Sequence, residues 1–208
     1  MCNLYSMTRA QATIRALFDD IVDNAGNLGP APEIYPDYPA PVIANTPEGL
    51  VLTKMRWGMP SPAVALKGKR ADKGVTNIRN TSSPHWRRWL GPTHRCVVPF
   101  TAFSEYQSGV GPKWFAPKED KPLAFFAGIW TEWTSVRKVK DGETTDRLFG
   151  FLTTAPNATV GRYHPKAMPV ILISPEAVHL WLNGTTEQAL QLQRTLPDDF
   201  LRVVDGPL

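Results

Sequence analysis

Long apolar runs are missing from this chain, and its first residues lack the charged and then apolar opening of a secretory leader. A membrane-spanning helix needs roughly 20 consecutive apolar residues, and no stretch approaches that length. A signal peptide would begin with a positive segment followed by an apolar one. We therefore expect a protein that has no membrane partner and stays in the cytoplasm.

Cysteine is scarce, because only Cys2 and Cys96 occur. Two cysteines in a reducing compartment do not make a disulfide framework. Cys96 lies in the β-rich run 95–99, which predicts a buried strand residue. Metal-ligand spacings, a glycine-rich phosphate loop and a serine-nucleophile elbow are also absent from the sequence. We therefore expect neither a metal nor an organic cofactor.

The overall composition is that of one globular unit. The chain has 208 residues, of which 42% are hydrophobic and 20% charged, and it shows no internal repeat. Such a length predicts a single domain over residues 1–208, and we expect a monomer. A net charge of +4 permits a polyanionic partner without requiring one. The 20 prolines and 7 tryptophans indicate a loop-rich fold with flat aromatic surfaces.

Three segments of the first half stand out by their patterning. Residues 9–21 predict a helix capped by Thr8, because apolar residues recur at helical spacing there. The proline-rich stretch 29–41 predicts a surface loop, since proline disfavours both helix and central strand. Residues 67–74 form a glycine-spaced basic loop containing Lys67, Lys69, Arg70 and Lys73. Such a run is either a solvated, mobile loop or a phosphate-facing one, and the sequence leaves both open.

Short strands with turn-like links dominate the rest of the chain. The predicted strands are 42–44, 50–57, 96–99, 103–106, 113–116, 123–133, 147–154, 170–173 and 201–204. Helices are predicted to begin at Pro84, with Trp86 and Trp89 as its packing face, at Pro175, and after a capping box formed by Thr185 and Gln188. Hairpin-length links favour an antiparallel sheet that curls to bury its faces. The predicted fold class is α+β, with a curled, mostly antiparallel, barrel-like sheet and peripheral helices.

The start of the chain carries the most distinctive chemistry. If Met1 is removed, Cys2 presents an α-amine and a thiol on one carbon. The amine has a pKa of roughly 7.7 to 8.0 and the thiol of roughly 8.5, so both have a reactive fraction near neutral pH. An amine condenses with an aldehyde to an imine, and an adjacent thiol can close on it to form a thiazolidine. The alternative is that Cys2 is an ordinary residue at a frayed end.

Five other polar positions are candidates for a site. Glu105 lies in a strand-like apolar run, where a buried carboxyl would have a raised pKa suited to acid–base catalysis, although alternation also allows a solvent-facing side chain. His164 precedes a strand, followed by Lys166, and it can be functional or merely structural. Asn77 and Arg79 would share one face of an extended segment, where Arg79 could clamp a phosphate and Asn77 could hold a substrate oxygen or the terminal amine.

These residues occur within a series of blocks that resembles the SOS response-associated peptidase family, whose members are also called abasic-site processing proteins. The blocks occur in the family's order from Met1 to about Trp181. They are Met1-Cys2, Trp57-Gly58, Asn77-Ile78-Arg79, 95–99 with 103–106, Ala127-Gly128-Ile129-Trp130, 151–157, and His164 followed by 168–172.

The resemblance implies a sensor of abasic sites in single-stranded DNA. Cys2 would crosslink covalently to the ring-opened sugar, shielding the lesion, with strand cleavage as a possible lyase side activity. Asn77 would orient the amine, Glu105 would shuttle protons, and His164 would bind the opened deoxyribose. The DNA contacts implied are Arg79 and Lys166 on phosphates and Trp57 under a flanking base. The protein would then be nucleoid-associated when bound to damaged DNA.

The chain also departs from the family's pattern. Asn3-Leu4 stands where Gly-Arg is common, so a phosphate contact at position 4 is missing. Trp57-Gly58 is followed by residues 59–62, Met-Pro-Ser-Pro, instead of a second tryptophan. Two other functions remain open. One is a cysteine-dependent peptidase with Cys2 as nucleophile and His164 as base, at minimum removing Met1 autocatalytically. The other is a binding module without catalysis.

Overall fold

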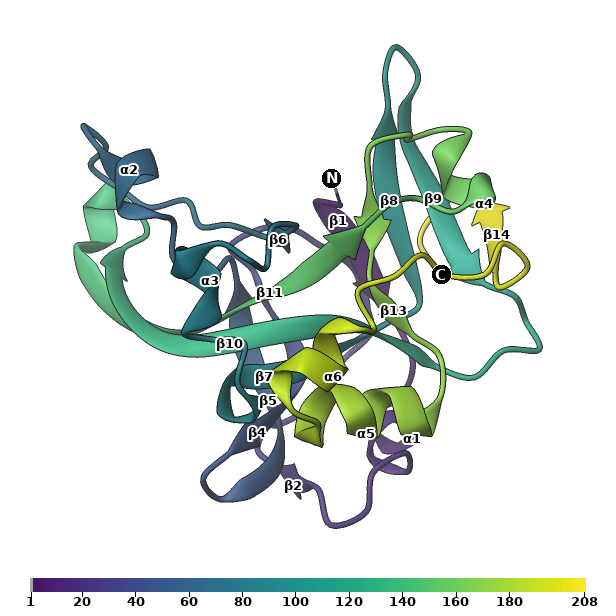
Figure 1. Ribbon diagram of the computed structural model, residues 1–208, viewed down its shortest axis with the longest axis horizontal. Helices are drawn as coiled ribbons and strands as arrows, with labels where there is room; N and C mark the ends of the chain where they lie inside the picture. The colour runs from purple at the N-terminus through teal and green to yellow at the C-terminus, as the bar shows by residue number, and fades with distance from the viewer. Residues whose placement is uncertain (1) are drawn as a thin grey trace.

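Two β-sheets form the framework of the computed structural model, which describes residues 2–208 (Figure 1). In the larger sheet, β11 pairs antiparallel with β10 and parallel with β5, which closes a circuit of five strands. In their order around the circuit these strands are β5 (Gly49–Trp57), β4 (Pro39–Thr46), β7 (Arg95–Phe100), β10 (Ala124–Val136) and β11 (Glu143–Thr154). Short strands join it: β2 (Val22–Asp23), β6 (Asn77–Ile78), β12 (Met168–Pro169) and β13 (Ile171–Leu172).

The smaller sheet contains the first strand of the chain near its middle. Its order is β14 (Leu201–Val204), β9 (Gly111–Pro117), β8 (Ala102–Gln107), β1 (Leu4–Met7) and β3 (Ala31–Ile34). β1 pairs antiparallel with both β8 and β3. The expected barrel-like, mostly antiparallel α+β domain is thus confirmed, and its circuit closes through one parallel pairing.

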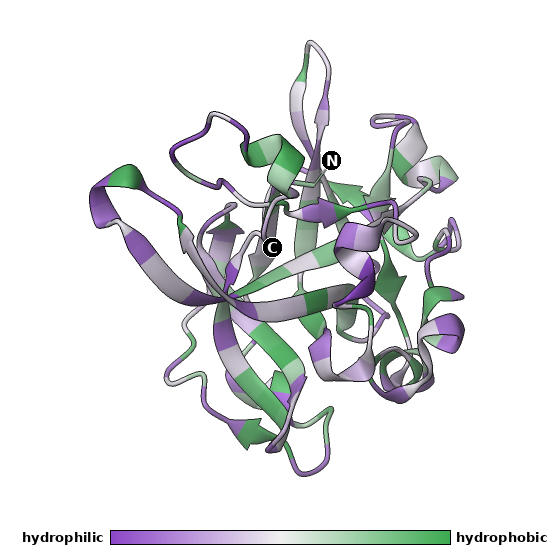
Figure 2. Ribbon diagram, turned by 60° about the vertical axis from the view of Figure 1, so that its left-hand side comes forward, coloured by the Kyte–Doolittle hydropathy of each residue, from purple (hydrophilic) through white to green (hydrophobic). Residues whose placement is uncertain are grey.

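An aromatic cluster joins the two sheets. Tyr5 of β1 is fully buried, and its ring centroid lies 5.1 Å from Trp57, 5.6 Å from Phe126 and 6.2 Å from Phe151. Burying each large apolar side chain contributes about 1.5–3 kcal/mol. Hydrophobic residues are concentrated along the central strands, and hydrophilic residues along outer loops and hairpin ends (Figure 2). The chain segment that follows Cys2 is therefore fixed in the core.

Short helices lie at the periphery. They are α1 (Gln11–Arg15), α2 (Ala63–Leu66), α3 (Pro84–Arg87), α4 (Ala158–Gly161), α5 (Pro175–Asn183) and α6 (Thr186–Leu190), with single 3-10 turns η1 (Pro92–His94) and η2 (Val139–Asp141). The indole of Trp181 on α5 donates to the carbonyl oxygens of Cys96 and Gly128, at 2.9 and 3.1 Å. None of the helices within residues 2–208 is long and apolar enough to cross a membrane.

The predicted helix over 9–21 is wrong in extent. The helix α1 begins after Ala10, ends at Arg15, and is not capped by Thr8, whose hydroxyl donates to Leu208 O at 2.6 Å. Asp20 has a φ of 54°, a left-handed conformation that α-helices do not contain. The apolar spacing therefore marks one helical turn followed by an irregular segment.

The expected proline-rich loop over 29–41 is also wrong, because β3 and the start of β4 lie in it. β3 is an edge strand, paired only with β1 among the described strands. Pro39 and Pro41 pair with β5, while β7 reaches β4 only at Ile43 and Ala44. Proline is compatible with a strand where one side carries no ladder, since its missing N–H is then not needed.

Several local predictions are confirmed. Strands β4 and β5 form the expected hairpin, in which Thr46 pairs with Gly49. Pro84 and Pro175 are at the first turns of α3 and α5, and the capping box of Thr185 and Gln188 is formed. Residues 67–74 form no helix or strand. Buried positions predicted as packing residues are Trp86, Trp89 and Cys96.

Candidate active site

The register between β1 and β8 brings Cys2 to Glu105. Leu4 pairs with Ser104 and Tyr5 with Phe103, so the residues before Leu4 run alongside the residues after Ser104. Cys2 is fully buried, and its Sγ donates to Leu4 O at 3.6 Å. Burial, together with the nearby Glu105 carboxyl, raises the pKa of the Cys2 thiol. The thiol is therefore protonated at neutral pH.

Asn77 approaches Cys2 from the other sheet, where β6 pairs in parallel with β11. Its Nδ2 donates to Cys2 O at 2.7 Å and to Thr76 Oγ1 at 2.8 Å. The Thr76 hydroxyl in turn donates to Asn3 Oδ1 at 3.1 Å. Asn77 Oδ1 is buried and accepts no hydrogen bond from residues 2–208. An acceptor in this state favours an added N–H or O–H group.

Glu105 and His164 form an acid–base pair. Glu105 is fully buried, and this burial raises its pKa to about 7, although a hydrogen bond from the Cys2 backbone N–H acts in the opposite direction. His164 Nε2 lies 3.6 Å from Glu105 Oε2, and His164 Nδ1 lies 3.3 Å from Tyr106 O. A carbonyl can only accept, so Nδ1 carries the proton and Nε2 of the neutral ring faces the carboxyl as an acceptor.

Helix α4 holds His164 in this position. The Asn157 side chain caps α4 by accepting from Val160 N at 3.0 Å. The backbone N–H of His164 then donates to Val160 O at 2.9 Å, which continues the turn beyond the helix. Burial lowers the pKa of His164, and the Lys166 charge adds to this. The ring is therefore mostly neutral at pH 7, as a proton acceptor for Glu105 must be.

Trp57 is not a stacking surface for DNA, and that prediction is wrong. Its side chain is fully buried, with ring centroids 5.2 Å from Phe151 and 6.4 Å from Phe149. Its Nε1 donates to Thr76 O at 3.3 Å. Trp57 is the last residue of β5, which pairs with β4 and β11, and its side chain lies in the core. The indole therefore supports the backbone next to Asn77 and does not meet a base.

Arg79 and Lys166 are exposed, as phosphate contacts require. Strand β6 ends at Ile78, so the alternation expected to place Asn77 and Arg79 on one face does not extend to Arg79. Arg79 is instead held through its backbone oxygen, which accepts from Gln193 Nε2 at 2.9 Å. The structure thus brings four predicted residues together, Cys2, Asn77, Glu105 and His164, and leaves the two cations on the surface.

Sequence reasoning missed Asn3 and Thr76. Both take part in the hydrogen-bonded chain that fixes Asn77, with Asn3 Oδ1 also 3.4 Å from Asn77 Nδ2. Asn3 is adjacent to Cys2, and Thr76 is adjacent to Asn77. This adjacency to predicted site residues was a signal that could have identified them. No residue pattern indicated that these two dipeptides, 74 residues apart along the chain, would meet.

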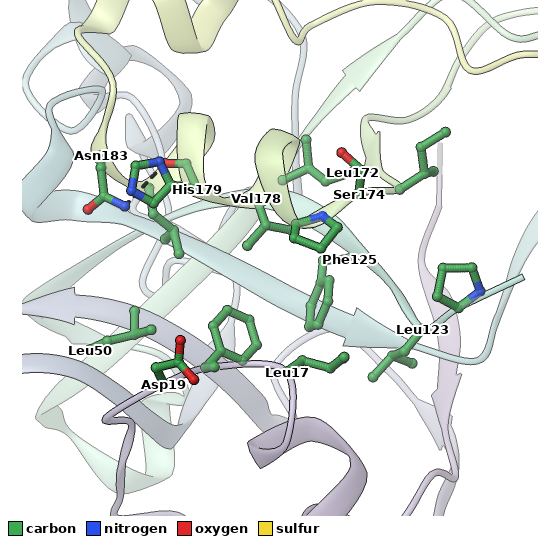
Figure 3. Close-up of a pocket in the computed structure, with 15 residues that line it drawn as sticks. Leu17, Asp19, Leu50, Leu123, Phe125, Leu172, Ser174, Val178, His179 and Asn183 are labelled. Atoms are coloured by element: carbon green, nitrogen blue, oxygen red, sulfur yellow. Dashed lines mark hydrogen bonds between the residues drawn. The ribbon is translucent and has the colours of Figure 1, made fainter.

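A separate apolar groove lies away from these residues (Figure 3). Its volume is about 370 Å³, and it lies between α5 and the segment that follows α1. Leu17, Leu50, Phe125 and Val178 contribute side chains to it. Its lining includes none of Cys2, Asn77, Glu105 and His164, so it is not the candidate active site.

Comparison with known families bears directly on this arrangement. The family described as SOS response associated peptidase (SRAP) matches residues 1–204. The chain belongs to this family. The match covers Cys2, Asn77, Glu105 and His164 together. No sequence among curated proteins is significantly similar to this SRAP chain.

Solved structures share the SRAP chain's fold at low sequence identity. A protein from Bordetella bronchiseptica has a TM-score of 0.72 and 21% identity, covering 100% of this chain and 99% of its own. A phage-related protein from the same organism has a TM-score of 0.70 and 21% identity, covering 100% and 94%. A protein from Bacteroides thetaiotaomicron has a TM-score of 0.69 and 20% identity, covering 97% and 90%. At these identities the likeness concerns the fold alone.

Proposed function

We propose that this protein recognises abasic sites in single-stranded DNA and forms a covalent thiazolidine crosslink through Cys2. The supporting observation is the buried cluster of Cys2, Asn77 and Glu105, in which a carboxyl of pKa about 7 accepts from the residue-2 N–H, and the Asn77 amide binds Cys2 O while its own oxygen accepts no hydrogen bond from residues 2–208. Removal of Met1, which lies outside the described residues, would make that nitrogen a primary amine. The proposed place of action is the cytoplasm, on damaged DNA.

The reaction proceeds in two bond-forming steps. The Cys2 amine attacks the aldehyde carbon of the ring-opened sugar, and the resulting carbinolamine loses water to give an imine. Protonated Glu105 supplies the proton that leaves with this water, and a carboxyl with a pKa near 7 is suited to giving and retaking it. The Cys2 sulfur then adds to the imine carbon, and its proton passes to the nitrogen. Both groups react at high effective molarity because one residue carries them.

An abasic nucleotide suits a buried site of this kind. It has no base to unstack or unpair, so moving it into a pocket costs less than flipping an intact nucleotide. Ring closure also determines the fate of the strand. An open imine permits β-elimination and strand cleavage, whereas a closed thiazolidine prevents it. Shielding is therefore the main outcome and lyase cleavage a side reaction.

The family's description gives the second candidate, a peptidase with Cys2 as nucleophile. Thiol peptidases work through a thiolate, usually stabilised by a protonated histidine. Here burial raises the pKa of the Cys2 thiol and lowers that of His164, so both groups are in their neutral forms. This state disfavours repeated peptide cleavage. It is compatible with the removal of Met1 as a single event.

The decisive experiment incubates the protein with an abasic single-stranded oligonucleotide and resolves the products on a denaturing gel. Mass spectrometry first verifies that Met1 has been removed. Wild type should give an adduct that survives heating. Cys2→Ser keeps the amine but has a poor ring-closing nucleophile, so it should give a labile imine, trapped only by borohydride, and more strand scission.

Cys96→Ser is the matched control, because Cys96 is the other buried cysteine and lies in β7. It should keep the heat-stable adduct. An adduct of equal stability from Cys2→Ser would exclude the thiazolidine. Turnover of peptides offered in parallel, without any DNA adduct, would instead favour the peptidase.

A further inference from the structure

Positive charge is concentrated in the middle of the chain. Between Glu48 and Glu105 the only acidic residue is Asp72. The ten basic residues in the same interval are Lys54, Arg56, Lys67, Lys69, Arg70, Lys73, Arg79, Arg87, Arg88 and Arg95. Arg95 is buried and Arg56 pairs with Asp37 and Asp146, so these two charges are compensated within the fold. Lys67, Lys69, Arg70 and Lys73 are all exposed and lie close together in the sequence.

The loop between α2 and β6 lines a hollow with some of these basic residues. The hollow has a volume of about 600 Å³, and its lining includes the cations Lys69, Arg70 and Lys73 and one acidic residue, Asp72. All three cations are exposed. Val139 of η2 also lines the hollow. Several cations around one concave surface favour a ligand with more than one negative charge.

The single carboxylate of this segment is held by hydrogen bonds from the protein. Asp72 is buried and accepts hydrogen bonds from Ser61 N at 2.9 Å, Ser61 Oγ at 2.6 Å and Gly74 N at 2.7 Å. Burial opposes ionisation of Asp72, but these hydrogen bonds outweigh it and lower its pKa. Asp72 is therefore a carboxylate whose negative charge is stabilised by the Ser61 and Gly74 donors. These hydrogen bonds fix the conformation of the loop.

Arg137, the residue directly after β10, fixes the base of the same loop. Its guanidinium donates to Gly58 O at 3.2 Å and to Lys73 O at 3.3 Å, and it pairs with Asp37 at 3.1 Å. A Cβ on Gly58 or Gly74 would lie 2.6 or 2.7 Å from this group, so both positions need glycine. A loop held in this way pays little conformational entropy when a ligand binds.

The loop leads directly into the candidate active site. Gly74 and Asn77 are three residues apart, a span of at most about 11 Å. Val75 is fixed on the way by two backbone hydrogen bonds with Met59. Figure 1 shows β6 between the loop that follows α2 and the start of β1. A strand seated at Asn77 therefore has the basic hollow within the reach of a few nucleotides.

We propose that the loop of residues 67–73 is a preformed binding surface for the sugar–phosphate backbone of single-stranded DNA on one side of the abasic nucleotide. Lys69, Arg70 and Lys73 neutralise consecutive phosphates there without reading the base sequence. The inference rests on the proposed function for its choice of ligand. It adds the place where the flanking strand runs, and it gives the protein affinity for undamaged single strands.

The test measures binding of a fluorescent, undamaged single-stranded oligonucleotide over a range of salt concentrations. Lys69→Glu/Lys73→Glu should weaken binding at least about tenfold at low salt. The slope of log affinity against log salt should fall by about 1.4, since each phosphate contact on a single strand contributes about 0.7. Lys54→Glu/Lys118→Glu changes the net charge equally at two exposed lysines outside the loop, and it should keep the slope.

Equal losses in the two double variants would overturn the proposal, because they would show a general effect of net charge. Binding that neither variant weakens would overturn it as well. The same proteins are then given abasic oligonucleotide over a range of concentrations, where Lys69→Glu/Lys73→Glu should need at least about tenfold more oligonucleotide than wild type to reach half of its maximal rate of adduct formation. Absence of an adduct in wild type with the loop effect intact would contradict the crosslinking function alone.

Discussion

At the scale of single residues, the proposed chemistry depends on proton transfer between Glu105 and His164. A carboxylate is costly in a fully buried position, and this cost raises the pKa of Glu105 to about 7. The neutral His164 ring offers Nε2 as an acceptor 3.6 Å away. A proton moved to His164 is therefore still close enough to return. In the proposed reaction, the same pair would catalyse water loss as an acid and sugar-ring opening as a base.

The raised pKa of Glu105 predicts a pH-dependent stability. A carboxyl in the unfolded chain has a pKa of about 4.3, so the folded state binds more protons between that value and about 7. The stabilising contribution of this carboxyl to the free energy of unfolding is complete below about pH 4.3. It is lost as the pH rises through about 7, and the loss is on the order of 3 kcal/mol. The lowered pKa of His164 acts in the opposite direction, and its contribution is lost as the pH falls below about 6.5.

Glu105→Gln isolates the contribution of the Glu105 carboxyl to the pH dependence of stability. Glutamine keeps the shape of the side chain but does not titrate. Urea unfolding at several values between about pH 4 and pH 8 should show the fall in free energy of unfolding in wild type and a smaller one in the variant. Parallel curves would mean that the carboxyl ionises normally. The adduct-forming rate of the variant should drop by about 10²–10⁴-fold, as expected for loss of a general acid.

Residue types alone indicated much of the site but not the direction in which each side chain points. Cys2, Asn77, Glu105 and His164 were all named from the sequence, and they lie together. Trp57 was assigned to the surface although it lies in the core. An aromatic residue has the same local pattern in both cases, and only the pairing of its strand with β11 decides which face is buried.

At the scale of secondary structure elements, the register of β1 determines the position of Cys2. Its pairing of Leu4 with Ser104 leaves only Asn3 between the strand and Cys2. One residue added between Asn3 and Leu4 would move Cys2 by about 3.4 Å and turn its side chain to the other face. The strand itself would keep its partners. The adduct-forming rate should therefore fall at least about 10²-fold with little change in thermal stability.

An insertion after Gly109 is the matched control. It lies in the turn between β8 and β9, beyond the last paired residues of the hairpin, Gln107 and Gly111, so the register that carries Glu105 is kept. Turn insertions of this kind cost little, so both stability and adduct formation should resemble wild type. Wild-type rates from the Asn3–Leu4 insertion, measured on denaturing gels, would show that the position of Cys2 is not fixed by β1.

Elements formed by neighbouring segments were predictable, and those formed by distant ones were not. The hairpin of β4 and β5 and the capping box before α6 follow from local turn and cap residues. β1 was missed because its four residues gain their strand conformation from β8 and β3, far along the chain. The same holds for Pro39 and Pro41, whose acceptability in a strand depends on which side of β4 is paired.

At the scale of the whole molecule, the candidate active site is formed where the two sheets pack against each other. Cys2 and Glu105 come with the smaller sheet, and Asn77 comes with the larger one. The closing contact between β5 and β11 is parallel, and such a pairing leaves no hairpin signal in the sequence. A barrel-like sheet was predictable from the number of strands, whereas the closure and the second sheet were not.

Coupling across the two sheets should be measurable through Tyr5 and Trp57, whose rings meet edge to face at 5.1 Å. In a double-mutant cycle with Tyr5→Leu and Trp57→Leu, urea unfolding should give an interaction free energy of about 0.5–1.5 kcal/mol, as for other aromatic pairs. Phe18, which packs against Phe125 elsewhere in the core, provides the control partner. Tyr5→Leu with Phe18→Leu should be additive within about 0.5 kcal/mol.

The same variants test whether docking of the sheets positions the chemistry. Tyr5 is three residues from Cys2, and Trp57 holds the carbonyl of Thr76 next to Asn77, so each ring supports one half of the site. Both Tyr5→Leu and Trp57→Leu should therefore slow adduct formation at temperatures where the variants remain folded, while Phe18→Leu should not. If adduct formation followed only the fraction of folded protein in all three variants, the rings would stabilise the fold without aligning Cys2 and Asn77.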